Sequence, residues 1–248
     1  MQKTIIIRDL LIQYHFYPSE NGKILLFLHG WRSEGVIWNN VAKRLNKENY
    51  TVYALDLPGF GASPAPKTPF TLSDYADIVS GFIKKMNLIK VNLVGHSFGG
   101  RVGIKLSAAK PELISRLVLV DSAGFADSGK QKVKLLAKLV KPLFAPKFMQ
   151  GVRKWIYEKI GSEDYLATPE LQKTFVNIIE EDLSSDLSCI QFPTLLIWGE
   201  NDQDTPVSYG KRMQSFIRNS QLVILPNAGH FSFLDNPEGF YNAVSQFI

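Results

Sequence analysis

One stretch in the first half of the chain restricts the possible folds more than any other. An apolar run at residues 91–94 leads into Gly-His-Ser-Phe-Gly at residues 95–99, and a helix-like run follows. A Gly-x-Ser-x-Gly turn between a strand and a helix is typical of a nucleophile elbow, which projects a serine hydroxyl out of the sheet. Gly95 and Gly99 suit such a turn because it leaves no room for a side chain beside the serine. Ser97 is therefore the candidate nucleophile.

A dinucleotide-binding loop is the other common glycine-rich turn between a strand and a helix. It requires Gly-x-Gly-x-x-Gly, with an acidic residue about 20 positions further on. The run Gly-His-Ser-Phe-Gly-Gly at residues 95–100 does not have that spacing. The sequence therefore favours an activated serine over a bound dinucleotide.

Apolar runs and amphipathic helix-like runs alternate along most of the chain. Buried strands of a parallel sheet are apolar throughout, and the helices that connect them cover both faces. The pattern predicts an α/β fold with a mainly parallel sheet of about eight strands. The strands are expected at residues 4–7, 10–17, 23–28, 51–56, 91–94, 116–120, 193–199 and 221–225, with helices near 36–46, 73–86, 101–109, 207–217 and 237–248.

The alternation stops between residues 125 and 188, where the sequence is helix-like and has no buried-strand pattern. It resumes with the strand that begins near residue 193. This predicts one core made of residues 1–124 and 189–248, with residues 125–188 inserted after the sixth strand.

Composition and charge narrow the class of protein further. The chain has 248 residues, 45% of them hydrophobic, which suits one large domain with a substantial core. No apolar run reaches the roughly 18 residues that span a bilayer. The net charge of +5 is unevenly distributed, with lysines at residues 127–159 and acids at residues 163–186, and no nucleic-acid motif is present. We expect a small-molecule partner, no nucleic acid, no stable membrane insertion, and a monomer or homodimer.

Cysteine usage and the first residues bear on location. The single cysteine, Cys189, excludes an intrachain disulfide, and the first residues lack the pattern of a signal peptide. We predict a cytoplasmic protein in which Cys189 is a small buried side chain.

A serine hydroxyl needs a base to accept its proton and an acid to orient that base. In open α/β sheets such groups gather at the carboxyl ends of the strands. His230 lies on a loop after the last predicted strand and is the candidate base. His15 lies within a strand, His29 belongs to a His-Gly-Trp motif, and His96 is on the wrong side of the turn to reach the serine hydroxyl.

The candidate acid lies on the loop after the preceding strand, which offers Glu200, Asp202 and Asp204. Asp204 also suits the start of a helix. An oxyanion hole requires two backbone N–H donors. Phe98 directly follows the nucleophile and supplies one, and Trp31, after the first buried strand, is placed to supply the other.

Together these motifs resemble the α/β-hydrolase fold superfamily, in its serine esterase-like branch with a helical lid. The resemblance implies that Asp202 is the acid of a Ser97, Asp202 and His230 triad. It also implies that residues 125–188 form a helical lid over the site and that no metal or organic cofactor is required. The matching pieces, in the family's order, are His29-Gly30-Trp31, Asp-x-Pro-Gly-x-Gly-x-Ser at residues 56–63, Gly-His-Ser-Phe-Gly-Gly at residues 95–100, Gly-x-x-Asp at residues 199–202, and Gly229-His230.

The resemblance implies a serine hydrolase that cleaves small to medium carboxylic esters through an acyl-enzyme. A C–C bond hydrolase of the meta-cleavage type, a lipase-like monoacylglycerol hydrolase, and a ligand-binding sensor on the same scaffold are the alternatives. The C–C hydrolases usually carry small residues after His-Gly and a tryptophan four residues past the catalytic histidine, where this chain has Trp31 and Leu234. Haloalkane dehalogenases and epoxide hydrolases carry an aspartate at the position of Ser97, so the resemblance argues against both of these activities.

Overall fold

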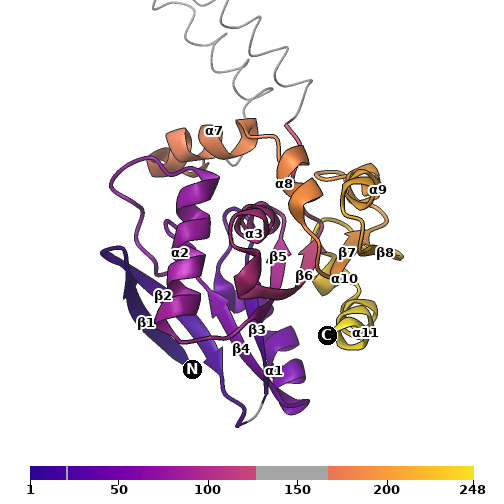
Figure 1. Cartoon of the computed structure of the whole chain (residues 1–248), viewed down its shortest axis with the longest axis horizontal. Helices are drawn as coiled ribbons and strands as arrows, with labels where there is room; N and C mark the ends of the chain where they lie inside the picture. The colour runs from indigo at the N-terminus through magenta and orange to yellow at the C-terminus, as the bar shows by residue number, and fades with distance from the viewer. Residues whose placement is uncertain (21, 127–166) are drawn as a thin grey trace, which may run out of the picture.

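The computed structural model describes residues 1–20, 22–126 and 167–248. An eight-stranded sheet lies at its centre, with strand order β1-β2-β4-β3-β5-β6-β7-β8 (Figure 1). β1 pairs antiparallel with β2 and β2 antiparallel with β4, and all later pairs are parallel. The predicted α/β fold with a mainly parallel sheet is confirmed. The strands are β1 (Gln2–Ile7), β2 (Leu10–Tyr17), β3 (Lys23–Leu28), β4 (Tyr50–Leu55), β5 (Val91–His96), β6 (Ile114–Val120), β7 (Thr194–Gly199) and β8 (Ser220–Leu225).

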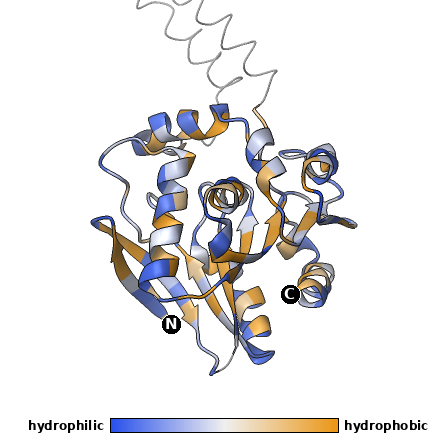
Figure 2. Ribbon diagram, in the orientation of Figure 1, coloured by the Kyte–Doolittle hydropathy of each residue, from blue (hydrophilic) through white to orange (hydrophobic). Residues whose placement is uncertain are grey.

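The central strands are buried on both faces, as their continuous apolar sequences predict. Along β3, Leu26 and Leu28 belong to one hydrophobic cluster, whereas Leu25 and Phe27 belong to the cluster on the opposite face. This alternation follows from the two-residue period of a strand. Figure 2 shows the same arrangement, with hydrophobic strands at the centre and hydrophilic residues on the outer sides of the helices.

Helices cover both faces of the sheet. One hydrophobic cluster joins the sheet to α2, α3, α8 and α9, and the other joins it to α1, α10 and α11. Among the described helices, none is long and apolar enough to cross a membrane. The helices are α1 (Asn39–Lys47), α2 (Leu72–Lys85), α3 (Phe98–Ala109), α7 (Gln172–Glu180), α8 (Ser184–Cys189), α9 (Val207–Phe216), α10 (Ser232–Asp235) and α11 (Pro237–Phe247), with 3₁₀ turns at Gly35–Trp38, Pro111–Leu113 and Pro169–Leu171.

The predicted helix at residues 73–86 illustrates how closely the sequence locates an element. α2 begins at Leu72 because Thr71 and Asp74 form a capping box, in which each side chain accepts a hydrogen bond from the backbone N–H of the other. The prediction for Cys189 is wrong, because the side chain is exposed at the end of α8. Its neighbours Leu187 and Ile190 take the buried positions instead.

The chain leaves the sheet after β6 and returns to it at the neighbouring strand β7. Gly124 and Leu183, which we call the neck, are joined by a hydrogen bond of 2.9 Å from the Leu183 N–H to the Gly124 carbonyl. Arg101 on α3 donates through Nη2 to the Ile178 carbonyl of α7 at 2.6 Å. Within the predicted insertion, residues 127–166 lie outside the described residues, so a helical lid remains a prediction.

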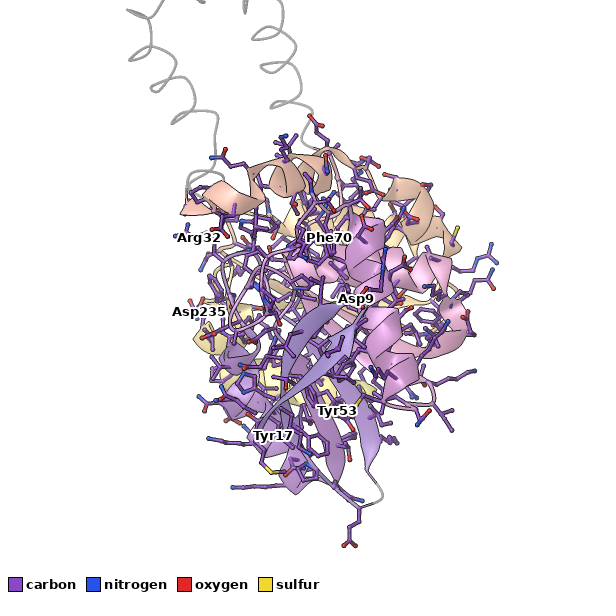
Figure 3. The ribbon with its side chains drawn as sticks, turned by 90° about the vertical axis from the view of Figure 1, so that its left-hand side faces the viewer. Asp9, Tyr17, Arg32, Tyr53, Phe70 and Asp235 are labelled. Atoms are coloured by element: carbon purple, nitrogen blue, oxygen red, sulfur yellow. The ribbon has the colours of Figure 1, made fainter. Side chains whose placement is uncertain are left out.

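The carboxyl ends of the parallel strands meet at the edge of the sheet nearest α7. Phe70 is joined to α7 there, since its N–H donates to the Thr174 hydroxyl at 2.9 Å. Figure 3 shows Arg32 and Phe70 toward the α7 end of the molecule and Tyr17 toward the opposite end. All predicted site residues follow strands that end at this edge.

Candidate active site

Ser97 occupies a strained turn between β5 and α3. Its backbone has φ 49° and ψ −108°, in a region that residues other than glycine rarely adopt. Such a conformation costs about 1–3 kcal/mol and persists only when its surroundings enforce it. Here the Ser97 N–H donates to the Val120 carbonyl at 3.0 Å, and the Ser97 carbonyl accepts from the Arg101 N–H at 3.2 Å. The geometry expected of a nucleophile elbow is present, with the serine half-buried.

The two flanking glycines are required by close backbone contacts. A Cβ atom on Gly95 would lie 2.5 Å from the carbonyl oxygen of Gly99. A Cβ atom on Gly99 would lie 2.5 Å from the carbonyl oxygen of Leu28, at the end of β3. These glycines therefore allow β3, β5 and α3 to converge at Ser97.

Asp202 is the carboxylate that pairs with His230. The residue is 5% exposed, and its Oδ2 lies 3.0 Å from His230 Nδ1. Oδ1 accepts the N–H groups of Asp204 at 2.9 Å and Thr205 at 3.0 Å, and the Thr205 hydroxyl lies 2.7 Å from Oδ2. Burial raises the pKa of Asp202, but the hydrogen bond and charge of His230, together with the Thr205 donors, outweigh burial and lower it. The carboxylate is thus held ionised.

The other two candidate acids do not contact the histidine through a hydrogen bond in the described part of the chain. Asp204 is exposed, and α9 starts with Pro206 as its N-cap, so Asp204 does not cap it. Glu200 is also exposed and accepts the Asn227 N–H at 3.3 Å. Of the three carboxylates, Asp202 is therefore the one that lies against His230.

His230 has its protonation pattern set by Asp202. An ionised carboxylate only accepts hydrogen bonds, so His230 carries a proton on Nδ1 and leaves Nε2 free to accept one. Burial lowers the pKa of His230, but the hydrogen bond and charge of Asp202, with the charges of Asp204 and Asp121, raise it above its ordinary value. Across residues 1–20, 22–126 and 167–248, no hydrogen bond joins His230 to Ser97. Such bonds are often long in unliganded sites and tighten around substrate.

Two other histidines fix the loops around the site. The Leu57 N–H donates to His29 Nε2 at 2.9 Å, so the proton of His29 is on Nδ1, which donates to the Gly30 carbonyl at 2.7 Å. His96 Nε2 lies 2.7 Å from the carbonyl oxygen of His230 and donates its proton to it. Burial lowers the pKa of His29 to about 4, and burial together with the charge of His230 lowers that of His96 to about 3. Both are neutral, and neither acts as the base.

The predicted oxyanion donors lie beside the elbow. Phe98 is the first residue of α3, and the N–H groups of a first helical turn have no acceptor within the helix. The Trp31 and Phe98 rings pack edge to face with centroids 5.2 Å apart. A Cβ atom on Gly30 would lie 3.5 Å from the Cβ atom of Ser97, so the loop that carries Trp31 touches the elbow. Within the described residues, the backbone N–H groups of Trp31 and Phe98 donate to no other group.

Two residues with a place in the site were missed by the sequence analysis. Asp121 is fully buried and accepts hydrogen bonds from Gly199 and Ser232. Asp121 directly follows an apolar strand, and this position is a signal by which the sequence could have identified it. Thr205 contacts the carboxylate of Asp202, and nothing in the sequence distinguishes it from an ordinary loop threonine.

In the described part of the chain, one group of side chains is close enough together to bind a metal ion. It consists of Asp202, Asp204 and His230. Each offers one ligand atom, and these atoms lie within 4.8 Å of one another. Both oxygens of Asp202 already accept hydrogen bonds, one of them from His230. The cluster therefore fits an acid–base pair better than a metal site.

Known proteins with similar sequence or structure were compared with the chain. It is 28% identical to a pimeloyl-acyl-carrier-protein methyl ester esterase of Nitrosomonas europaea, over 91% of this chain and 96% of that one. It is 26% identical to a 2-hydroxy-6-oxo-6-(2'-aminophenyl)hexa-2,4-dienoic acid hydrolase of Metapseudomonas resinovorans, over 96% and 88% of the two chains. A thermophilic esterase from Thermogutta terrifontis superposes with a TM-score of 0.76 at 25% identity, covering 99% of this chain and 97% of the other.

The match to a family model covers most of the chain. The model, described as the alpha/beta hydrolase family, matches residues 25–243, which include the elbow, the Asp202 loop and the His230 loop. The eight-stranded sheet has the architecture of that family. The chain belongs to the alpha/beta hydrolase family.

Proposed function

We propose that this protein is a serine hydrolase that cleaves small to medium carboxylic esters through an acyl-enzyme intermediate. The observation that carries the proposal is the contact between buried Asp202 and half-buried His230, 3.0 Å apart, beside the strained turn of Ser97. A fully hydrogen-bonded acid and a histidine with its Nδ1 proton fixed form the acid–base half of a serine triad. The similarity to two esterases supports ester bonds as the substrate class.

The mechanism starts with proton transfer from Ser97 to His230. The Ser97 Oγ attacks the ester carbonyl carbon while His230 Nε2 takes the hydroxyl proton, and Asp202 stabilises the imidazolium. The carbonyl oxygen becomes an oxyanion, which accepts hydrogen bonds from the backbone N–H groups of Trp31 and Phe98. When the tetrahedral intermediate collapses, His230 gives its proton to the leaving alcohol, and Ser97 remains acylated.

Hydrolysis of the acyl-enzyme repeats the same steps with water. His230 Nε2 accepts a proton from water as the water oxygen attacks the acyl carbon. The second tetrahedral intermediate then releases the carboxylic acid, and Ser97 regains its proton from His230. Every step uses groups of this chain and water, so the proposed mechanism requires no metal or organic cofactor.

A series of p-nitrophenyl esters with acyl chains from C2 to C12 tests the proposal. Wild type is expected to hydrolyse them with a maximum at short or medium chains. Ser97→Ala should lower kcat by about 10⁴- to 10⁶-fold while KM changes little. A maximum at long chains would favour the lipase-like alternative instead. Equal rates for wild type and Ser97→Ala would overturn the mechanism.

C–C bond hydrolysis is the second candidate, favoured by the similarity to the dienoic acid hydrolase of Metapseudomonas resinovorans. Against it, the Trp31 ring packs on Phe60 and Phe175, with centroids 4.8 and 5.1 Å away, which fills space beside the oxyanion loop. A 2-hydroxy-6-oxo-dienoate, whose visible absorbance disappears on cleavage, distinguishes the two activities. Serine-dependent loss of that absorbance, without turnover of any ester, would favour C–C cleavage.

A ligand-binding sensor would retain the fold without an activated serine. Labelling by a fluorophosphonate separates this alternative from an enzyme, because the reagent reacts rapidly only with an activated serine. We expect labelling of wild type and none of Ser97→Ala. Absence of labelling in folded wild-type protein would favour the sensor.

A further inference from the structure

Asp121 is a buried acid that the proposed mechanism does not use. It follows β6 directly, is 0% exposed, and has φ 44°, so its backbone also lies in the left-handed region. β6 lies between β5, which leads to Ser97, and β7, which leads to Asp202. Asp121 therefore lies behind the site, between the strands that deliver the nucleophile and the acid.

The carboxylate of Asp121 joins the two loops that carry the acid and the base. Oδ1 accepts the N–H of Gly199 at 2.7 Å, and Gly199 precedes Asp202 by three residues. Oδ2 accepts the N–H of Ser232 at 3.1 Å and its hydroxyl at 2.5 Å, and Ser232 follows His230 by two residues. One side chain therefore sets the position of both loops relative to each other.

The charged groups around Asp121 make its own charge relevant to the base. The charge of Asp202, on the loop after β7, acts on Asp121, and the charge of Asp121 acts on His230, on the loop after β8. In the part of the chain that the structure describes, no lysine, arginine or N-terminus forms an ion pair with Asp121. Among these neighbours, only His230 takes up positive charge during the reaction.

The ionised form of Asp121 suits its three hydrogen bonds, since all three partners donate. Burial, helped by the charge of Asp202, raises the pKa of Asp121 to about 7, although the hydrogen bonds from Ser232 and Gly199 oppose that rise. Its negative charge in turn contributes to raising the pKa of His230.

We propose that Asp121 is a positioning residue of this site, whose carboxylate aligns the Asp202 and His230 loops and places a second negative charge behind the imidazole. The kinetic consequences rest on the proposed esterase function, whereas the effect on His230 does not. Asparagine at this position keeps the shape of the side chain. It removes the charge and turns an N–H toward at least one donor, so alignment and charge are both lost.

The titration of His230 is measured by NMR on protein labelled with ¹⁵N only in histidine. The chain has four histidines, so four ring systems are followed, and His230→Gln assigns the signal of interest. Asp121→Asn should lower the pKa of His230. It should also reduce kcat for the best p-nitrophenyl ester by about 10- to 100-fold, as a misplaced catalytic group does, with KM nearly unchanged.

Asp204→Asn is the matched control, because it removes another charge that raises the pKa of His230. The side chain of Asp204 is exposed, and only its backbone N–H bonds to Asp202. This variant should also lower the pKa of His230 but keep the wild-type kcat on the high-pH plateau. The contrast separates the loss of a charge from the loss of alignment.

A folded Asp121→Asn protein with the wild-type kcat and the wild-type pKa of His230 would overturn the proposal. If Asp121→Asn does not fold, Ser232→Ala decides the question, because it removes one of the three hydrogen bonds and leaves the carboxylate in place. Ser232→Ala should lower both kcat and the pKa of His230 relative to wild type. No change in either quantity would equally overturn the proposal. If wild type hydrolyses no ester, the proposed function fails while the NMR titration still tests Asp121.

Discussion

The side chain of His96 donates a hydrogen bond of 2.7 Å to the backbone carbonyl of His230. The residue next to the nucleophile thus fastens the loop that carries the base. The two rings lie 4.9 Å apart, centroid to centroid. His96 was excluded as the base by its position in the turn, and the structure gives it this different role.

His96→Phe is expected to lower kcat because the loop of His230 loses its attachment. Phenylalanine has a similar shape and cannot donate the hydrogen bond. We expect a loss of about 10- to 100-fold in kcat, measured with p-nitrophenyl esters. His96→Gln restores a donor and should recover part of the rate. Equal rates in the Phe and Gln variants would show that the hydrogen bond does not matter.

The strain at Ser97 predicts that glycine at this position gives a more stable protein than alanine. Glycine adopts the left-handed region without a steric penalty, whereas alanine does not. Ser97→Gly should therefore be more stable than Ser97→Ala by about 1–2 kcal/mol, as measured by urea unfolding. If the two variants unfold at the same urea concentration with the same slope, the turn stores no strain.

Two of the three glycines of α3, Gly99 and Gly103, should respond oppositely to alanine. Gly99→Ala forces a Cβ atom to 2.5 Å from the Leu28 carbonyl oxygen and should destabilise by about 1–3 kcal/mol. Gly103→Ala meets only side-chain methyl groups, the nearest being Leu117 Cδ1 at 3.4 Å, and should stabilise α3 by up to about 1 kcal/mol. Thermal unfolding of both variants measures the difference. A stable Gly99→Ala protein would contradict the close approach of β3 and α3.

The activity should fall on acidification, with a midpoint above the ordinary pKa of histidine. His230 must be neutral to accept the proton of Ser97, and its pKa is raised above 6.5. The value of kcat/KM is therefore full above that pKa and is lost as the pH drops through it. Asp202→Asn removes the main cause of the rise, so the midpoint should move to lower pH while kcat falls on the order of 10⁴-fold. A profile of kcat/KM against pH for both proteins checks this, and an unmoved midpoint would argue against the pairing.

The sequence was most informative where one physical rule dominates. Continuous apolar runs predicted strands buried on both faces, and the residues of β3 divide between two hydrophobic clusters as that rule requires. The rule that functional groups follow strand ends pointed to His230 and to the loop of three carboxylates, and the family resemblance selected Asp202 among them. The structure places Asp202 and His230 3.0 Å apart.

Sequence reasoning failed where a role depends on distant contacts. Asp121 bonds to residues 78 and 111 positions away, and no local pattern encodes such pairs. A small side chain just before a strand suggests burial for Cys189, but the turn of α8 directs its neighbours Leu187 and Ile190 inward instead. The helical lid and the cytoplasmic location remain predictions, the first because residues 127–166 lie outside the described part of the chain.

The neck, formed by Gly124 and Leu183, holds the two ends of the inserted segment close together. Its two ends are held together by a backbone hydrogen bond, and β6 and β7 pair directly beneath it. Closing a flexible segment costs only about 0.6 kcal/mol more for each doubling of its length. The length and composition of the segment before α7 can therefore change at little cost in chain entropy, whereas α7 itself is tied to α3 through Arg101 and Ile178. The sheet and the segment before α7 can thus vary independently of each other over the course of sequence change.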